Sequence, residues 1–177
     1  PTAYFASVTS SSGYNWKWDA HTGNLDSTAF GDYRNTNEVY VIDRGYDHNG
    51  THTGYRKLVV LSVTDSSYTI KYSKLDGSKE HTKQITKDTS VNFVAFSFQT
   101  NESVLIETQK TEWDILFTQY THVFDDTPPT PYLVTGVLIN PYHVEVAVDK
   151  QKSFAEISYE SISSYQLKKN LNVIGYD

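Results

Sequence analysis

Short runs of β-branched and aromatic residues, separated by Gly, Asn, Asp and Pro, recur along most of this chain and constrain its fold more than any other feature. The segment SYTIKYS, 67–73, alternates strictly, with Tyr68, Ile70 and Tyr72 on one side and polar residues between them. A period of two places such apolar side chains on one face of a β-strand. An Asp-Gly pair follows and signals a turn. Repeated along the chain, this pattern predicts antiparallel hairpins.

Further runs predict most of the remaining strands. EVYVI and RKLVVLSV are joined by a polar loop with three glycines and indicate a long hairpin. VNFVAFSF is apolar on both faces, which is typical of a strand at the centre of a sheet. YLVTGVLI is interrupted by Gly136, where we expect a bulge or a close backbone approach. The expected strands are 38–42, 56–63, 67–73, 91–98, 103–107, 111–124, 132–139 and 142–149.

Other segments lack this pattern. DDTPPTP, 125–131, contains three prolines, which lack the backbone N–H that a ladder needs, so we expect an extended surface loop. From Pro1 to Arg34 the chain is polar apart from YNWKW, which favours a first strand or a docking arm. The lysine-bearing stretch before Val91 is expected to be a polar connection.

The fold class follows from these segments. We expect one all-β domain over residues 1–177, antiparallel and sandwich-like or open-barrel-like. Only the region after Ser153 invites a helix, because Ser153 and Glu156 have capping-box spacing. We therefore expect one short helix near the C-terminus, at about Tyr159 to Leu167.

Composition excludes several functions. The 15 Lys and Arg stand against 21 Asp and Glu, a net charge of −6, which argues against binding a nucleic acid through its phosphates. The absence of cysteine excludes disulfides, thiol nucleophiles and cysteine-type zinc sites. No apolar run approaches the roughly 20 residues that a membrane-spanning helix needs.

No pattern of catalytic residues stands out either. Serine is abundant without a G-x-S-x-G context, no glycine-rich loop precedes a helix, and no pair of acidic residues is marked out as a glycosidase pair. The loop with Asp43, Asp47, His48 and His52 has two histidines at H-x3-H spacing, but its glycines exclude a helix, so a structural or solvated loop is favoured over a metal site. A binding protein is expected rather than an enzyme.

His122 and His143 remain after the core positions are assigned. Both lie on expected strands that flank the proline-rich loop. An imidazole in an aromatic cleft fits a flat apolar ligand such as haem, whose iron accepts His, Met, Cys or Tyr from proteins. Because Met and Cys are absent, only His and Tyr remain as iron ligands. Four aromatic residues surround the two histidines in sequence and are candidates for a haem pocket: Tyr120, Phe124, Tyr132 and Tyr142.

Several of these segments resemble the HmuY-like family of haem-binding lipoproteins from Bacteroidota-type Gram-negative bacteria. The similarity is carried by WDILFTQYT, YLVTGVLINPYHVEVAVD and the terminal NVIGYD, with VYVIDRG, GYRKLVVL and YTIKY before them. The Trp113-Asp114 strand is the most specific of these motifs. Together the motifs cover most of the chain from Glu38 to Asp177.

The resemblance implies capture of haem by two axial side chains and delivery to an outer-membrane haem receptor. It also implies export, with a lipid-anchored cysteine upstream of Pro1, and a location at the cell surface as an outer-membrane lipoprotein, or secretion. His143 and His122 are the candidate axial ligands, and Tyr142 or Tyr132 are possible substitutes. Two other functions stay open: a β-sandwich module that recognises a glycan or a partner protein through exposed aromatics, and a hydrolase.

Overall fold

The computed structural model of the chain describes residues 2–19, 27–34, 36, 38–124, 126–128 and 130–168. Its sheets are antiparallel and its helices few and short, which confirms the all-β class. Within these residues no barrel closes, and no helix has the length and apolarity to cross a membrane. The single domain expected over 1–177 stays a prediction. The chain divides into two compact units: unit 1 is Pro1–Trp18, Ala29–Thr89 and Phe93–Ile106, and unit 2 is Asp19–Thr28, Ser90–Asn92 and Glu107–Asp177.

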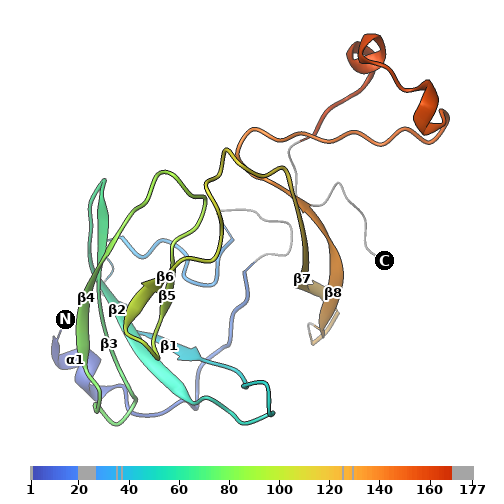
Figure 1. Cartoon of the computed structure of the whole chain (residues 1–177). Helices are drawn as coiled ribbons and strands as arrows, with labels where there is room; N and C mark the ends of the chain where they lie inside the picture. Colours follow the sequence, from blue (N-terminus) through green and yellow to red (C-terminus); the bar gives the residue numbers. More distant parts are fainter. Residues whose placement is uncertain are drawn as a thin grey trace. The chain divides into compact units, whose positions relative to one another are not determined.

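A four-stranded antiparallel sheet forms the centre of unit 1 (Figure 1). Three of its strands match expected runs, but the fourth lies where a polar connection was expected. That fourth strand alternates between half-buried and exposed side chains. An edge strand needs few apolar residues and commonly carries lysine, so polarity alone was a poor guide here. In sheet order the strands are β1 (Tyr40–Asp43), β2 (Tyr55–Val63), β3 (Ser67–Ser73) and β4 (His81–Thr86).

The core of unit 1 lies on one face of this sheet, around Tyr72 in β3. Tyr72 is 1% exposed and pairs across the strands with Leu58, which is also buried. Its ring centre lies 5.7 Å from that of Phe96 and 4.9 Å from that of Phe98. Burial raises the pKa of the Tyr72 hydroxyl, which donates a hydrogen bond to Asn101. One side chain therefore joins the sheet to the segment that follows it.

That segment contains a short hairpin of β5 (Ala95–Ser97) and β6 (Glu102–Val104). The expectation of a long central strand over 91–98 was wrong, because β5 has three residues and pairs only with β6. The rings of Phe96 and Phe98 pack on the core instead of entering the main sheet. A run that is apolar on both faces predicts contact on both sides, but it does not decide which strand lies beside it.

The N-terminal segment covers the other face of the sheet, as a docking arm. It forms α1 (Thr2–Ser7), whose Phe5 is 2% exposed. The Lys57 and Lys71 ammonium groups lie 4.9 and 5.0 Å from the Phe5 ring centre. Lys57 itself is 1% exposed, and its Nζ donates to the carbonyl of Val8 at 2.9 Å and to that of Leu75 at 3.3 Å. Two carbonyls and a ring thus replace the water around a buried ammonium.

We expect Phe5→Leu to lower the free energy of unfolding by about 1–2 kcal/mol. Leucine keeps much of the buried apolar volume but removes both cation–π contacts, which contribute about 0.5–2 kcal/mol each. Phe5→Ala should cost about 3–5 kcal/mol, since it also leaves a cavity. Urea unfolding followed by circular dichroism measures both. Tyr4→Leu is the matched control on the same helix, because Tyr4 is 62% exposed. An equal loss in Tyr4→Leu and Phe5→Leu would contradict the role of the two lysines.

Unit 2 contains a two-stranded antiparallel hairpin of β7 (Ile115–Phe124) and β8 (Thr130–Ile139). The ladder continues into the proline-rich segment, with Pro131 opposite Val123, so the expected loop is shorter than 125–131. Each strand of such a hairpin has an outer edge. A proline is tolerated where its missing N–H would point to that edge, so Pro131 did not exclude pairing.

The strand expected over 142–149 is absent. The sequence of this segment alternates between apolar and polar residues, but the segment makes only an isolated bridge. In that bridge Val146 and Lys168 exchange two backbone hydrogen bonds of 2.9 Å. A perfect alternation is not sufficient when no neighbouring strand supplies the ladder.

The C-terminal helix expected near Tyr159 is present as a 3-10 helix, η2 (Tyr159–Ser164), and a shorter one precedes it, η1 (Phe154–Glu156). The expected contact at capping-box spacing is present, because Ser153 N and Oγ donate to Glu156 Oε2 at 2.8 and 2.7 Å. The Ser and β-branched content of this region is consistent with helices no longer than a turn or two.

Asn140, directly after β8, is the main polar anchor of unit 2. It is 1% exposed. Its Nδ2 donates to the carbonyls of Lys110 and Trp113 at 2.7 and 2.6 Å. Its Oδ1 accepts from Asn92 Nδ2 at 3.0 Å and from Tyr142 N at 2.9 Å. Every polar atom of this buried amide is therefore used, and the chain on both sides of the hairpin is tied to it.

Asn140→Asp should lower the stability of unit 2 by about 2–4 kcal/mol. The aspartate keeps the shape, but it cannot donate to the two carbonyls and it places a charge in a buried site. Thermal unfolding followed by tryptophan fluorescence measures the loss. Gln151→Glu makes the same chemical change at an exposed position and should alter stability by less than about 0.5 kcal/mol. Similar losses in the two variants would show that Asn140 is not an anchor.

Candidate functional site

Three of the residues singled out from the sequence meet at the loop end of the β7–β8 hairpin. His122 pairs directly with Tyr132 across the strands, and its ring centre lies 4.9 Å from that of Phe124. The Phe124 and Tyr132 ring centres are 5.9 Å apart. His122 is 9% exposed, whereas Phe124 and Tyr132 are 44% and 54% exposed. This hairpin-end cluster of His122, Phe124 and Tyr132 combines a nearly buried imidazole with two half-exposed rings.

Tyr120 lies on the same face of β7, two residues from His122. It pairs with Val134, which is buried, and its ring lies over the backbone of Gly136. A Cβ at Gly136 would lie 3.3 Å from Tyr120 Cε1. The ladder is unbroken there, so Gly136 is the site of a close approach and not of a bulge. Tyr120 continues the aromatic face of the hairpin away from the loop end.

Tyr142 and His143 lie beyond the opposite end of the hairpin, after Asn140. Their ring centres are 4.2 Å apart, and Lys110 Nζ lies 4.5 Å from the centre of the Tyr142 ring. His143 was expected to open a strand, but it lies in a turn, is exposed and has a left-handed φ of 64°. A non-glycine residue adopts this conformation mainly in turns.

The structure does not bring His122 and His143 together. His122 is opposite Tyr132, whereas His143 follows Ile139, seven positions further along β8, which is about 23 Å at about 3.3 Å per residue. Two axial nitrogens on one iron lie only about 4 Å apart, given bonds of about 2.0 Å. In this conformation the two imidazoles belong to different ends of the hairpin and do not flank one haem.

The histidine-bearing loop between β1 and β2 is held by its own hydrogen bonds. His52 Nε2 lies 2.8 Å from Asp43 Oδ1, and Asp47 Oδ1 accepts from the backbone of Asn49 and Thr51 at 2.9 Å each. In the residues that the structure describes, no group of three or more acidic, His or Cys side chains has the arrangement of a metal site. The loop is a structured turn, as the glycines indicated.

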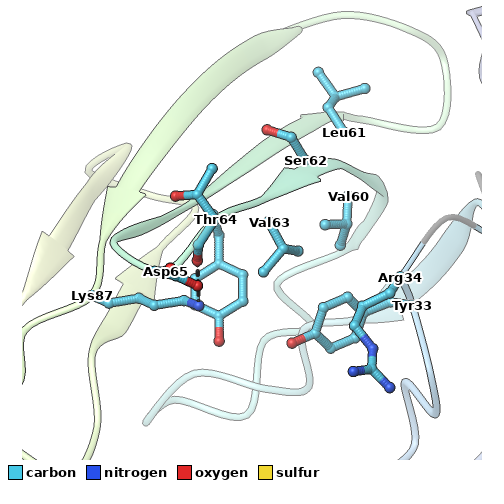
Figure 2. A pocket seen from close by; sticks show the side chains of 10 residues that line it. Tyr33, Arg34, Val60, Leu61, Ser62, Val63, Thr64, Asp65 and Lys87 are labelled. Carbon is cyan, nitrogen blue, oxygen red and sulfur yellow. Dashed lines mark hydrogen bonds between the residues drawn. The ribbon is translucent and has the colours of Figure 1, made fainter.

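A cavity in unit 1 was not anticipated from the sequence. It has a volume of about 550 Å³ and opens beside the end of β2 (Figure 2). Figure 2 shows Thr64 and Lys87 on one side and Tyr33 and Arg34 on the other, with Val63 between them and Val60 above Tyr33 and Arg34 in this view. Its lining residues are Tyr33, Arg34, Val60, Leu61, Ser62, Val63, Thr64, Asp65, Tyr68 and Lys87.

A β-bulge shapes this cavity. Val60 pairs with Ile70 and Ser62 pairs with Thr69, so Leu61 is an extra residue in β2. Bulges re-aim side chains and often lie beside functional sites. The sequence carried one weak signal of it, because RKLVVLSV has apolar residues on both parities instead of a clean alternation. Tyr33 and Arg34 come from a segment without regular structure and carried no signal at all.

Comparisons with protein-family models, with curated proteins and with solved structures find no match to this chain. Its function is therefore argued from the two groups of side chains just described, the hairpin-end cluster in unit 2 and the cavity in unit 1.

Proposed function

We propose that this chain is a haem-binding surface protein of the HmuY-like type, with His122 as an axial ligand of the iron. The observation that carries the proposal is the hairpin-end cluster, in which a nearly buried imidazole contacts the ring of Phe124 and lies opposite Tyr132 across the strands, with both aromatic rings partly exposed. As an exported lipoprotein it would capture haem at the cell surface and pass it to an outer-membrane receptor.

The chemistry of the cluster supports this choice of ligand. Iron in haem takes His, Tyr, Met or Cys from a protein, and the chain has neither Met nor Cys. His122 supplies the nitrogen, and Tyr132, its cross-strand partner, supplies a phenol on the same face. The flat porphyrin is apolar on both faces, so the exposed areas of Phe124 and Tyr132 would gain hydrophobic contact on binding.

The near burial of His122 adds a condition. At 9% exposure, and with the Phe124 ring 4.9 Å away, the imidazole is covered by its aromatic neighbours. Haem would therefore take the place of part of that cover. Phe124 stands near the end of β7, beside the loop, where strand ends open at little cost in free energy.

His143 is not part of the proposed site. It lies beyond the other end of the hairpin, and its ring contacts Tyr142 rather than the cluster. His122 would then be the one histidine that holds the iron.

Titration with haemin tests the ligand assignment. The protein should give a shifted Soret band, and His122→Ala should weaken binding by at least about tenfold and change the band position, because an iron–nitrogen bond is lost. His143→Ala is the matched control and should bind as the parent does. The assignment is wrong if only His143→Ala alters the spectrum. The haem function itself is wrong if the parent leaves the spectrum of free haemin unchanged.

The aromatic contacts of Phe124 and Tyr132 with haem can be tested separately from the iron ligand. Phe124→Ala together with Tyr132→Ala should weaken haem binding several-fold, since apolar cover is lost, while the Soret position stays that of the parent because His122 still ligates. Tyr46→Ala, which removes a 72%-exposed ring in unit 1, is the control and should have no effect. A moved Soret band in the double variant would mean that Tyr132, not His122, ligates the iron.

A further inference from the structure

We propose that the cavity in unit 1 binds an acidic saccharide, a pyranose that carries a carboxylate. The proposal is independent of haem binding, because every lining residue belongs to unit 1 and the hairpin-end cluster belongs to unit 2. The volume of about 550 Å³ is within the range of about 300–1,000 Å³ typical of small-ligand sites.

Lys87 points to a negatively charged group on the ligand. Its Nζ donates to the carbonyl of Thr64 at 2.6 Å and lies 4.6 Å from the centre of the Tyr68 ring. None of the ion pairs in the described part of the chain includes Lys87. An ammonium has three N–H donors, and the Thr64 carbonyl takes one of them. The remaining donors are available to a carboxylate, and such a charge-assisted bond is about twice as strong as a neutral one.

The positive charge of Arg34 is already neutralised by an ion pair with Asp32. Its Nε and Nη2 donate to the two carboxylate oxygens of Asp32 at 2.8 and 2.9 Å. This bidentate bond holds the pKa of Asp32 at about 2. The Arg34–Asp32 pair therefore stays ionised and adds no net charge to the cavity. Among the lining residues, the remaining charges are the ammonium of Lys87 and the carboxylate of Asp65, on the turn after β2. One cation beside one carboxylate favours a singly charged ligand over a phosphate.

The aromatic residues favour a sugar over a flat ring. Tyr33 and Tyr68 have ring centres 6.3 Å apart at an interplanar angle of 62°. Rings at this angle form no slot into which a planar base or porphyrin could stack. One face of Tyr68 is also taken by Lys87. A pyranose instead needs one ring edge or face for its C–H groups and several polar groups for its hydroxyls.

The polar groups of the cavity meet that need. Ser62 brings a hydroxyl, which both donates and accepts, and Asp65 brings an acceptor. The Thr64 hydroxyl is used within its own turn, where it accepts from Ser67 N at 3.0 Å. Burial and a hydrogen bond with Tyr68 raise the pKa of Tyr33, so its hydroxyl is protonated at neutral pH. Val60 and Val63 form the apolar floor between these groups (Figure 2). A uronic acid has hydroxyls for these polar groups, C–H groups for the small apolar floor and a carboxylate for the one cation.

Titration with glucuronate, followed by the backbone amide signals in NMR spectra, tests the proposal on the whole chain. Glucuronate at millimolar concentration should shift the signals of the cavity residues, and glucose should bind at least about tenfold more weakly, because it lacks the partner for Lys87. Acetate at the same concentration should leave these signals in place, since a bare carboxylate gains nothing from the hydroxyls and the floor.

Variants then locate the site. Lys87→Met should weaken glucuronate binding by about tenfold, and Lys87→Arg should largely retain it. Lys83→Met is the matched control, on β4 but not among the lining residues, and should bind as the parent does. Thermal unfolding of each variant separates loss of binding from loss of fold.

Three outcomes would overturn the proposal. One is the absence of shifts in the parent protein at tens of millimolar glucuronate. Another is equal shifts with acetate, which would mean an anion site without selectivity for a sugar. The last is glucuronate binding that Lys87→Met leaves unchanged. Because haem binding is read at the Soret band and depends on His122, none of these outcomes bears on the haem proposal, and failure of that proposal leaves this one standing.

Discussion

The contact of Tyr72 with Phe96, Phe98 and Asn101 is the interaction on which the rest of unit 1 depends. A sheet of four short strands has two faces to cover, and here the described helix that packs on it, α1, has only six residues. Tyr72 brings the β5–β6 segment onto one face, while the buried ammonium of Lys57 and the ring of Phe5 hold the N-terminal arm on the other. Side chains from the N-terminal arm and from the segment after the sheet therefore complete the core.

Unit 2 buries fewer apolar side chains than unit 1 does in the described residues. Its hairpin has many exposed apolar side chains, and its main buried polar group is the amide of Asn140, which ties the end of β8 to the turn before β7. This anchor also decides where Tyr142 and His143 lie. The loop end of the hairpin is free of that constraint, and there the hairpin-end cluster combines a buried imidazole with two exposed rings.

Particular residues explain which expectations were confirmed. The segment 67–73 was placed correctly, because its alternation matches a strand with one buried face and its neighbours on both sides are strands. The equally regular segment 142–149 was placed wrongly, because alternation reports the two faces of a strand but not its edges. His122, Phe124 and Tyr132 were grouped correctly, since a short loop between paired strands brings both sides together. His143 was grouped with them wrongly, because the ladder separates the two ends of a hairpin.

The sequence alone determined the strand-rich class, the hairpins with short or glycine-rich connections, and the absence of Met and Cys. These are local properties, set by side-chain period, turn residues and composition. Only the tertiary structure decided which histidine lies among aromatics, where the bulge at Leu61 opens a cavity, and that Tyr33 and Lys87 both contact Tyr68. Such contacts join residues far apart in the chain, so they depend on register and on the packing of irregular segments, which no local pattern encodes.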